Sequence, residues 1–248
     1  MKTRKFLYPL LALSVSIVVA TSFAQKKPEK KWTDWSKKEA EKMLGDSPWS
    51  QTQTDTDTSE MFYSPTNDPR ISGRVTSNTG SRIGEGAVNS AVTITFHVRF
   101  FSARPVRQAH ARLMELQQSP PPEVVAKLQN FAELRSPDSI IVTVTFQAPD
   151  QRYYNSVMQT FNSAITSTLK NNTYLERSDG KRLFLEEYVP PGKDGFGARF
   201  IFLRAPEGKP FIEGTNGEIH FFCQFPRSGK IDRRFKLANM MYEGELEY

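Results

Sequence analysis

The chain has 248 residues, a formal net charge of +6 and a single cysteine, Cys223. This length fits one large domain, or one domain with an extended arm, and is ample for a hydrophobic core. One cysteine excludes an internal disulfide, so stability must come from the core. The charge is modest, and half of it lies in the first five residues, so nucleic acid is not an expected partner.

The first 24 residues have the layout of a secretory signal peptide. Met1–Lys5 contains three basic residues and no acid, and Phe6–Ala20 is almost wholly apolar. Ser22 and Ala24 then give the small-x-small pattern that signal peptidases accept. We therefore predict a signal peptide over residues 1–24, cleavage after Ala24, and a periplasmic or extracellular protein.

An uncleaved membrane anchor is the alternative, because residues 6–24 approach the roughly 20 residues of a membrane-spanning helix. Pro9, the serines and the small-residue site favour cleavage. Membrane contact is expected only if the segment stays attached. The basic run Lys26–Lys31 follows; it is either a solvated N-terminus or a contact for anionic lipid or wall polymer.

Residues 25–87 are predicted to form an N-terminal arm. Ser36 and Glu39 have the spacing of a capping box, which starts a short helix that Gly45 and Pro48 end. Residues 51–85 are rich in polar residues and glycine. They are predicted to be a long polar loop or arm, with room only for brief strands.

Three tryptophans surround the short helix and are the candidate contacts for a partner or ligand: Trp32, Trp35 and Trp49. Exposed tryptophans stack on sugar rings or anchor a partner protein. The alternative is that they fix the helix to the main domain, because large aromatic side chains are generally buried.

Residues 88–248 are predicted to form an α+β globular domain. Alternation and helical spacing place strands at 92–101, 140–146, 174–177, 182–189, 196–203, 218–225 and 230–237, and helices at 104–118, 123–134 and 151–171. Short turns, such as Asp179-Gly180, make the later strands antiparallel. We expect a mainly antiparallel sheet of about five to seven strands with three helices packed on one face.

No residue pattern predicts a catalytic, cofactor-binding or metal site. The three histidines, His97, His110 and His220, lack the spacing of metal ligands and are expected to be ordinary surface residues. His220 and Cys223 lie three apart on one strand, so they point to opposite faces and do not form a catalytic pair. Cys223 is expected to be buried and unreactive.

Three stretches, Trp35–Trp49, Ala103–Leu113 and Phe225-Pro-Arg with Ile231–Glu247, resemble a family of exported bacterial proteins that open with a Trp-helix-Ser-Pro-Trp segment. Together these stretches are spread over most of the chain that follows the signal peptide. The resemblance implies an extracytoplasmic bacterial protein. The family has no established activity or catalytic residues, so it assigns no site.

These observations favour a non-enzymatic exported module that binds a protein or an envelope polymer. The alternative is an envelope hydrolase whose site is assembled only in the tertiary structure, with carboxylates near His97 or Arg99 as the place to look. Convergent polar groups in a cleft would favour the enzyme, and a flat apolar patch would favour the binding module.

Overall fold

The computed structural model describes residues 30–57, 92–226 and 229–248. The chain divides into two compact units, Met1–Lys30 and Lys31–Tyr248. The predicted signal peptide, and with it the anchor alternative, lies outside the described residues, as does most of the predicted polar loop. Residues 31–57, which are part of the predicted arm, lie in the compact unit Lys31–Tyr248.

The described chain begins with both helices and strands, and from Thr173 on it consists mostly of strands. The helical segments are η1 (Trp32–Asp34), α1 (Lys37–Gly45), α3 (Arg104–Gln118), α4 (Pro122–Glu133), α5 (Gln151–Ser163), α6 (Thr166–Leu169), η2 (Lys170–Asn172) and η3 (Leu237–Asn239). The strands are β1 (Ser50–Asp57), β2 (Val92–Phe100), β3 (Ser139–Gln147), β4 (Thr173–Arg177), β5 (Arg182–Phe184), β6 (Glu187–Val189), β7 (Ala198–Leu203), β8 (Glu218–Gln224), β9 (Lys230–Lys236), β10 (Met241–Tyr242) and β11 (Glu245–Leu246).

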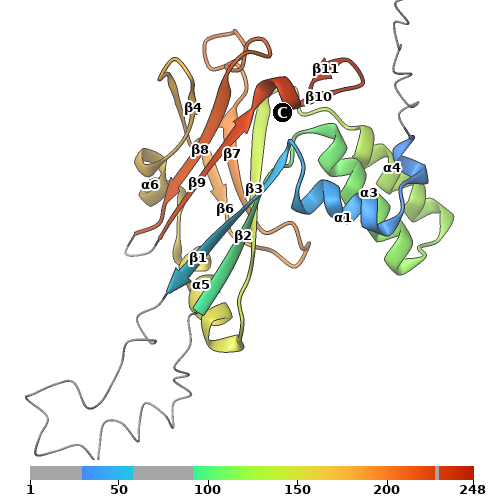
Figure 1. Ribbon diagram of the computed structural model, residues 1–248, viewed down its shortest axis with the longest axis horizontal. Helices are drawn as coiled ribbons and strands as arrows, with labels where there is room; N and C mark the ends of the chain where they lie inside the picture. Colours follow the sequence, from blue (N-terminus) through green and yellow to red (C-terminus); the bar gives the residue numbers. More distant parts are fainter. Residues whose placement is uncertain (1–29, 58–91, 227–228) are drawn as a thin grey trace, which may run out of the picture. The chain divides into compact units, whose positions relative to one another are not determined.

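The α+β class and the antiparallel pairing are confirmed, but the strands form two main sheets where the sequence predicts one. Sheet A has the order β1-β2-β3-β7-β6, sheet B has the order β5-β4-β8-β9, and β10 and β11 form a separate hairpin. Every pairing is antiparallel. Figure 1 shows the strands of the two main sheets in two layers.

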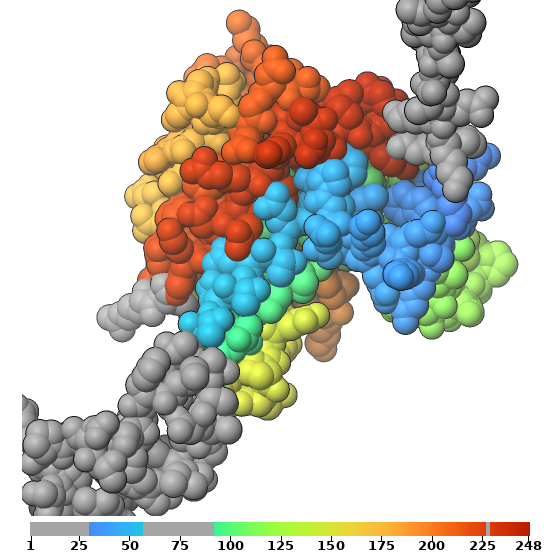
Figure 2. All heavy atoms as spheres, viewed as in Figure 1, coloured from blue at the N-terminus to red at the C-terminus, as the bar shows by residue number. Residues whose placement is uncertain are grey.

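The two sheets are joined along one side by glutamine side chains. Gln53 Nε2 donates to the Lys230 carbonyl, and Gln53 Oε1 accepts from the Asp232 amide. Gln51 Nε2 donates to the Arg234 carbonyl. Edge strands β1 and β9 therefore lie side by side without a backbone ladder, as the blue and red surfaces in Figure 2 show. Polar side chains thus satisfy edge groups that would otherwise be open to pairing.

On the other side, one continuous segment passes from sheet B to sheet A. The predicted strand 182–189 is interrupted at Leu185 and Glu186. The Leu185 amide donates to the Thr173 carbonyl on β4, whereas the Glu186 amide donates to the Ile201 carbonyl on β7. The strand is interrupted because a segment that switches sheets at a corner satisfies its amides in both layers.

The core lies between the two sheets. Side chains that alternate along the strands face inward, and ring centroids of Phe100 and Phe235 approach to 4.8 Å across the layers. On β8, the inward set that the sequence predicts is confirmed: Ile219, Phe221 and Cys223 are fully buried, and Phe225 is 3% exposed.

Three helices pack together beside sheet A, where α3 contacts both α1 and α4 (Figure 1). Arg99 fixes α1 to the sheet, because its Nε donates to the Leu44 carbonyl in the last turn of α1. A cation at this end of a helix satisfies free carbonyls and complements the helix dipole. The expected capping box at Ser36 and Glu39 is confirmed at the start of α1.

The predicted helix over residues 151–171 is wrong beyond Ser163. Asp150 caps α5 as expected, but Ala164 and Ile165 are extended, and α6 begins only at Thr166. The break is stabilised by Tyr188, whose hydroxyl donates to the Phe161 carbonyl and whose amide donates to the Thr166 hydroxyl. Phe161 lies between Phe146 and Phe225, so α5 packs against both sheets and not beside α3 and α4.

Candidate functional site

The three tryptophans proposed as partner contacts are packed inside the compact unit. Trp32, Trp35 and Trp49 are 9%, 8% and 4% exposed. Trp32 Nε1 donates to the Glu133 carboxylate on α4, and Trp49 Nε1 donates to the Glu247 main-chain oxygen. Burial and satisfied indole groups favour the packing alternative, and they leave little ring surface for a partner.

None of the three histidines is an exposed surface residue, so that expectation is wrong. His97 is half-buried beside Thr52. His110 packs against the rings of Phe101 and Phe196, and burial, with the nearby Arg99 charge, lowers the pKa of His110 to about 3. His220 is 8% exposed. In the described ranges, no group of three or more His, Cys, Asp or Glu side chains could hold a metal ion.

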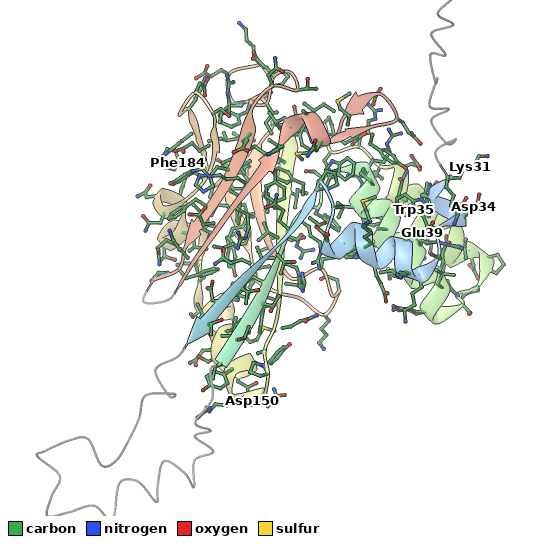
Figure 3. All side chains as sticks on the ribbon, in the orientation of Figure 1. Lys31, Asp34, Trp35, Glu39, Asp150 and Phe184 are labelled. Atoms are coloured by element: carbon green, nitrogen blue, oxygen red, sulfur yellow. The ribbon has the colours of Figure 1, made fainter. Side chains whose placement is uncertain are left out.

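The outer face of sheet B carries a row of aromatic side chains on three adjacent strands. Phe184 on β5 pairs in register with Tyr174 on β4, which pairs with Phe222 on β8. The Tyr174 and Phe222 rings are stacked, 5.1 Å apart and inclined by 20°. Phe184 is 46% exposed and lies on the opposite side of the molecule from Trp35 and Glu39 (Figure 3).

The β4–β5 hairpin places Tyr174 and Phe184 of this row side by side. Asp179 and Gly180 form the turn between β4 and β5, where Gly180 has φ +82° and the Asp179 carboxylate accepts the Lys181 amide. A left-handed conformation at this point favours glycine. The turn places Glu176 opposite Arg182 and Tyr174 opposite Phe184.

A charged row lies beside the aromatic one. The register aligns Arg182, Glu176, His220 and Arg234 across all four strands of sheet B. Arg182 donates to the Glu176 carboxylate, and its guanidinium carbon lies 4.2 Å from the centre of the Tyr174 ring. Stacked arginine and aromatic groups of this kind combine a cation–π contact with an ion pair.

His220 is held between two carboxylates. Its Nε2 lies 2.7 Å from Asp232 Oδ1, and its Nδ1 lies 3.7 Å from Glu176 Oε1. The hydrogen bond from Arg182 is the main cause of a lowered Glu176 pKa. Burial opposes ionisation of Asp232, but hydrogen bonds and charges from His220 and Lys230 outweigh it and lower the Asp232 pKa. Both carboxylates are therefore ionised at neutral pH.

We call the outward side chains of the four strands the aromatic face: Arg182, Phe184, Tyr174, Glu176, Glu218, His220, Phe222, Gln224, Lys230, Asp232, Arg234 and Lys236. Its four lysine and arginine side chains are all exposed, whereas its three acidic side chains are all half-buried. A molecule that approaches this face therefore meets positive charge around an apolar strip.

This arrangement suits binding better than acid–base catalysis. A general base needs a ring nitrogen within reach of the substrate, but His220 Nε2 is bonded to Asp232 and Nδ1 is buried. Near His97 and Arg99, the partners seen in the described part of the chain are hydroxyl and carbonyl oxygens, not the carboxylates that the hydrolase alternative requires.

No protein-family model, curated protein or solved structure matches this chain. The resemblance to the exported bacterial family therefore stays a prediction. Within the described residues, no helix has the length and apolar character needed to cross a bilayer.

Sequence reasoning missed the aromatic face. It assigned Phe221 to the core face of its strand but gave no role to Phe222, which has the opposite phase. The Asp179-Gly180 turn indicates the β4–β5 hairpin, but the register that pairs Tyr174 with Phe184 depends on a three-residue loop, Ser178–Gly180, with Arg177 bonded to Lys181. The pairing of Tyr174 with Phe222 joins strands that are distant in sequence, and no local pattern indicates it.

Proposed function

We propose that this protein is a non-enzymatic binding or assembly module exported to the bacterial cell envelope, and that the aromatic face binds its partner. The observation that carries the proposal is the row Phe184, Tyr174 and Phe222 on an outward sheet face. Aromatic side chains and arginine are enriched in protein–protein interfaces, and an apolar strip with a polar rim is typical of an interaction site.

The partner that fits this surface is a protein segment with acidic side chains around an apolar or aromatic anchor. The exposed rim consists of Arg182, Lys230, Arg234 and Lys236, while the acids lie deeper and are partly neutralised. Complementary charge speeds encounter and selects partners, and the desolvated aromatic centre supplies most of the affinity.

Export is supported by the layout of residues 1–24, which contains a basic start, an apolar stretch and a small-residue cleavage site. The resemblance to exported bacterial proteins agrees with it. Intact-mass analysis of protein recovered from the envelope should give a species that begins at Gln25. A membrane-bound species that keeps Met1–Ala24 would contradict cleavage and support the anchor alternative.

Site-specific photo-crosslinking in intact cells tests the binding surface. A photoreactive residue at Phe184 should give a discrete protein adduct, and the crosslinked peptide of the partner should be acidic. Leu203 on β7 is a matched control, because its side chain is 44% exposed against 46% for Phe184. The same residue at Leu203 should give no such adduct.

Charge reversal refines this test. Arg234→Glu should weaken the adduct from position 184 and reduce its sensitivity to salt, because it removes one rim cation. Equal crosslinking at positions 184 and 203 would contradict a specific surface. If position 184 crosslinks only to envelope polymer, the partner of the aromatic face is a polymer and not a protein. Hydrolysis of envelope material that depends on His220 would instead support the hydrolase.

A further inference from the structure

A second site lies away from the aromatic face and shares no residue with it. A cavity of about 260 Å³ opens between the start of α3, the segment after α4, the end of β7 and the C-terminal hairpin. Its polar lining includes Ser102, Arg107, Ser136, Arg204, Glu245 and Glu247. We call it the arginine cavity. Its size suits a small ligand or one headgroup.

Arg107 is the most buried cation of this cavity, at 4% exposed. Its Nη1 donates to the carbonyls of Phe101 and Ser102, whereas its Nε is buried and has no partner within the described residues. Removing a guanidinium from water without a counter-charge is costly. Burial is also the main reason that the Arg107 pKa falls to about 10. The charges of Arg204 and Arg104 lower this pKa further, whereas those of Glu247 and Glu133 oppose the fall.

Arg204 forms a second wall and is held in place by the main chain. Its Nε donates to the Ser136 carbonyl, and its Nη2 donates to the Ser139 and Tyr248 main-chain oxygens. Its guanidinium carbon lies 4.2 Å from the centre of the Tyr248 ring. These contacts fix the orientation of a planar donor group before any ligand arrives.

The carboxylates that line the cavity are already engaged elsewhere. Glu247 forms an ion pair with the Arg104 guanidinium and accepts a hydrogen bond from the Arg104 amide, and Glu245 pairs with Arg135 at the exposed rim. Across the described ranges, no glutamate or aspartate side chain forms an ion pair with Arg107 or Arg204. Arg204 instead donates to the Tyr248 main-chain oxygen, and the charges of Glu247 and Glu133 act on Arg107 without forming an ion pair with it.

We propose that the arginine cavity binds a small ligand through a phosphate group. A phosphate monoester carries a charge near −2 at neutral pH, so its oxygens can accept from the guanidinium groups of Arg107 and Arg204 together. Guanidinium groups also match the geometry of phosphate oxygens. Ser102 and Ser136 also line the cavity.

Calorimetric titration of the full protein with inorganic phosphate and with glycerol phosphate tests the site, at constant ionic strength set with chloride. We expect saturable binding of one phosphate per chain. Arg204→Gln should lower the affinity at least tenfold, whereas Arg182→Gln on the aromatic face should leave it unchanged. Absence of saturable binding, or equal affinity in Arg204→Gln, overturns the proposal.

A second measurement needs no variant and therefore does not depend on how Arg204→Gln folds. Nitrogen-15 NMR of the unmodified chain should show phosphate-induced shifts of the Nε signals of Arg107 and Arg204, which saturate together. The signals of Arg182 and Arg234 should stay in place. Shifts that grow linearly, or that spread over all arginines, overturn the site.

The phosphate group could belong to a soluble ester or to a lipid headgroup, and sedimentation with vesicles separates these sources. Vesicles of phosphatidic acid in phosphatidylcholine should carry the protein down only if the cavity accepts a lipid phosphate, and Arg204→Gln should abolish that. Sedimentation lost in this variant supports the site with a lipid ligand. Saturable glycerol phosphate binding without sedimentation supports it with a soluble one. Sedimentation that Arg204→Gln leaves unchanged contradicts the lipid assignment.

Discussion

Trp49 Nε1 donates a 2.8 Å hydrogen bond to the main-chain oxygen of Glu247, a residue 198 positions further along the chain. The same indole ring meets Tyr242 edge-on, with ring centroids 6.0 Å apart. Tyr242 in turn donates to Gln108 on α3. The beginning and the end of the compact unit are thus joined through one buried aromatic cluster.

Substitution of Trp49 should therefore destabilise the whole unit. Trp49→Ala should lower the free energy of unfolding by about 3–5 kcal/mol, because it leaves a large cavity. Trp49→Phe should cost about 1–3 kcal/mol, mainly through the unsatisfied Glu247 oxygen. Urea unfolding measures both. Leu134→Ala, at a side chain that is 61% exposed, is the control and should change little. Equal stability of Trp49→Ala and wild type would contradict this role.

The capping box of α1 gives a smaller and local prediction. Ser36 Oγ accepts from the Glu39 amide, and the Glu39 carboxylate accepts from the Ser36 amide. Ser36→Ala should lower the free energy of unfolding by about 1 kcal/mol, because the Glu39 amide loses its acceptor. Lys37→Ala removes only an exposed pair with Glu41 and should cost much less. Similar losses for the two variants in urea unfolding would count against the cap.

Local patterns predicted the local structure. The Ser36 cap, the Asp150 cap, the Asp179-Gly180 turn and the strand phase around Cys223 all depend on neighbours within a few residues, and all are present. β1 was not predicted as a full strand, because its residues are polar. Gln53 is nevertheless 7% exposed, since it bridges to β9 across the gap between the sheets.

The features that the sequence did not predict depend on contacts between residues far apart in the chain. The corner at Leu185 and Glu186, and the break after Ser163, both depend on partners in other strands. The candidate site has the same origin, because register between distant strands brings Tyr174 and His220 onto one face. The arginine cavity combines four segments, and no spacing in the sequence indicates that Arg107 and Arg204 share it.

Cys223 should be chemically silent in the folded protein. Its side chain is fully buried beside the Thr173 hydroxyl, and burial raises the pKa of the thiol to about 12. Since the thiolate is the reactive form, a thiol reagent should label native protein only as fast as the core opens. A Phe184→Cys variant supplies an exposed thiol as the control and should react at once. Rapid labelling of Cys223 under native conditions, or a disulfide-linked dimer, would show that this strand face is not closed.

Acid should lower the free energy of unfolding by protonating the carboxylates of the aromatic face, and Asp232→Asn should reduce this effect. The folded-state pKa of Asp232 lies below its ordinary value of 3.8, and that of Glu176 lies below 4.5. Groups with a lowered folded-state pKa add stability above the unfolded-state value, and this stability is lost as pH falls through the folded-state pKa. The free energy of unfolding should therefore fall between about pH 5 and pH 2.

Asp232→Asn keeps an oxygen acceptor for His220 but cannot ionise, so the fall should be smaller in this variant. Glu218→Gln is the control, because in the described part of the chain its carboxylate forms no ion pair, and it should keep more of the wild-type pH dependence than Asp232→Asn does. If urea unfolding shows the same pH dependence for Asp232→Asn and wild type, the charges around His220 do not stabilise this face.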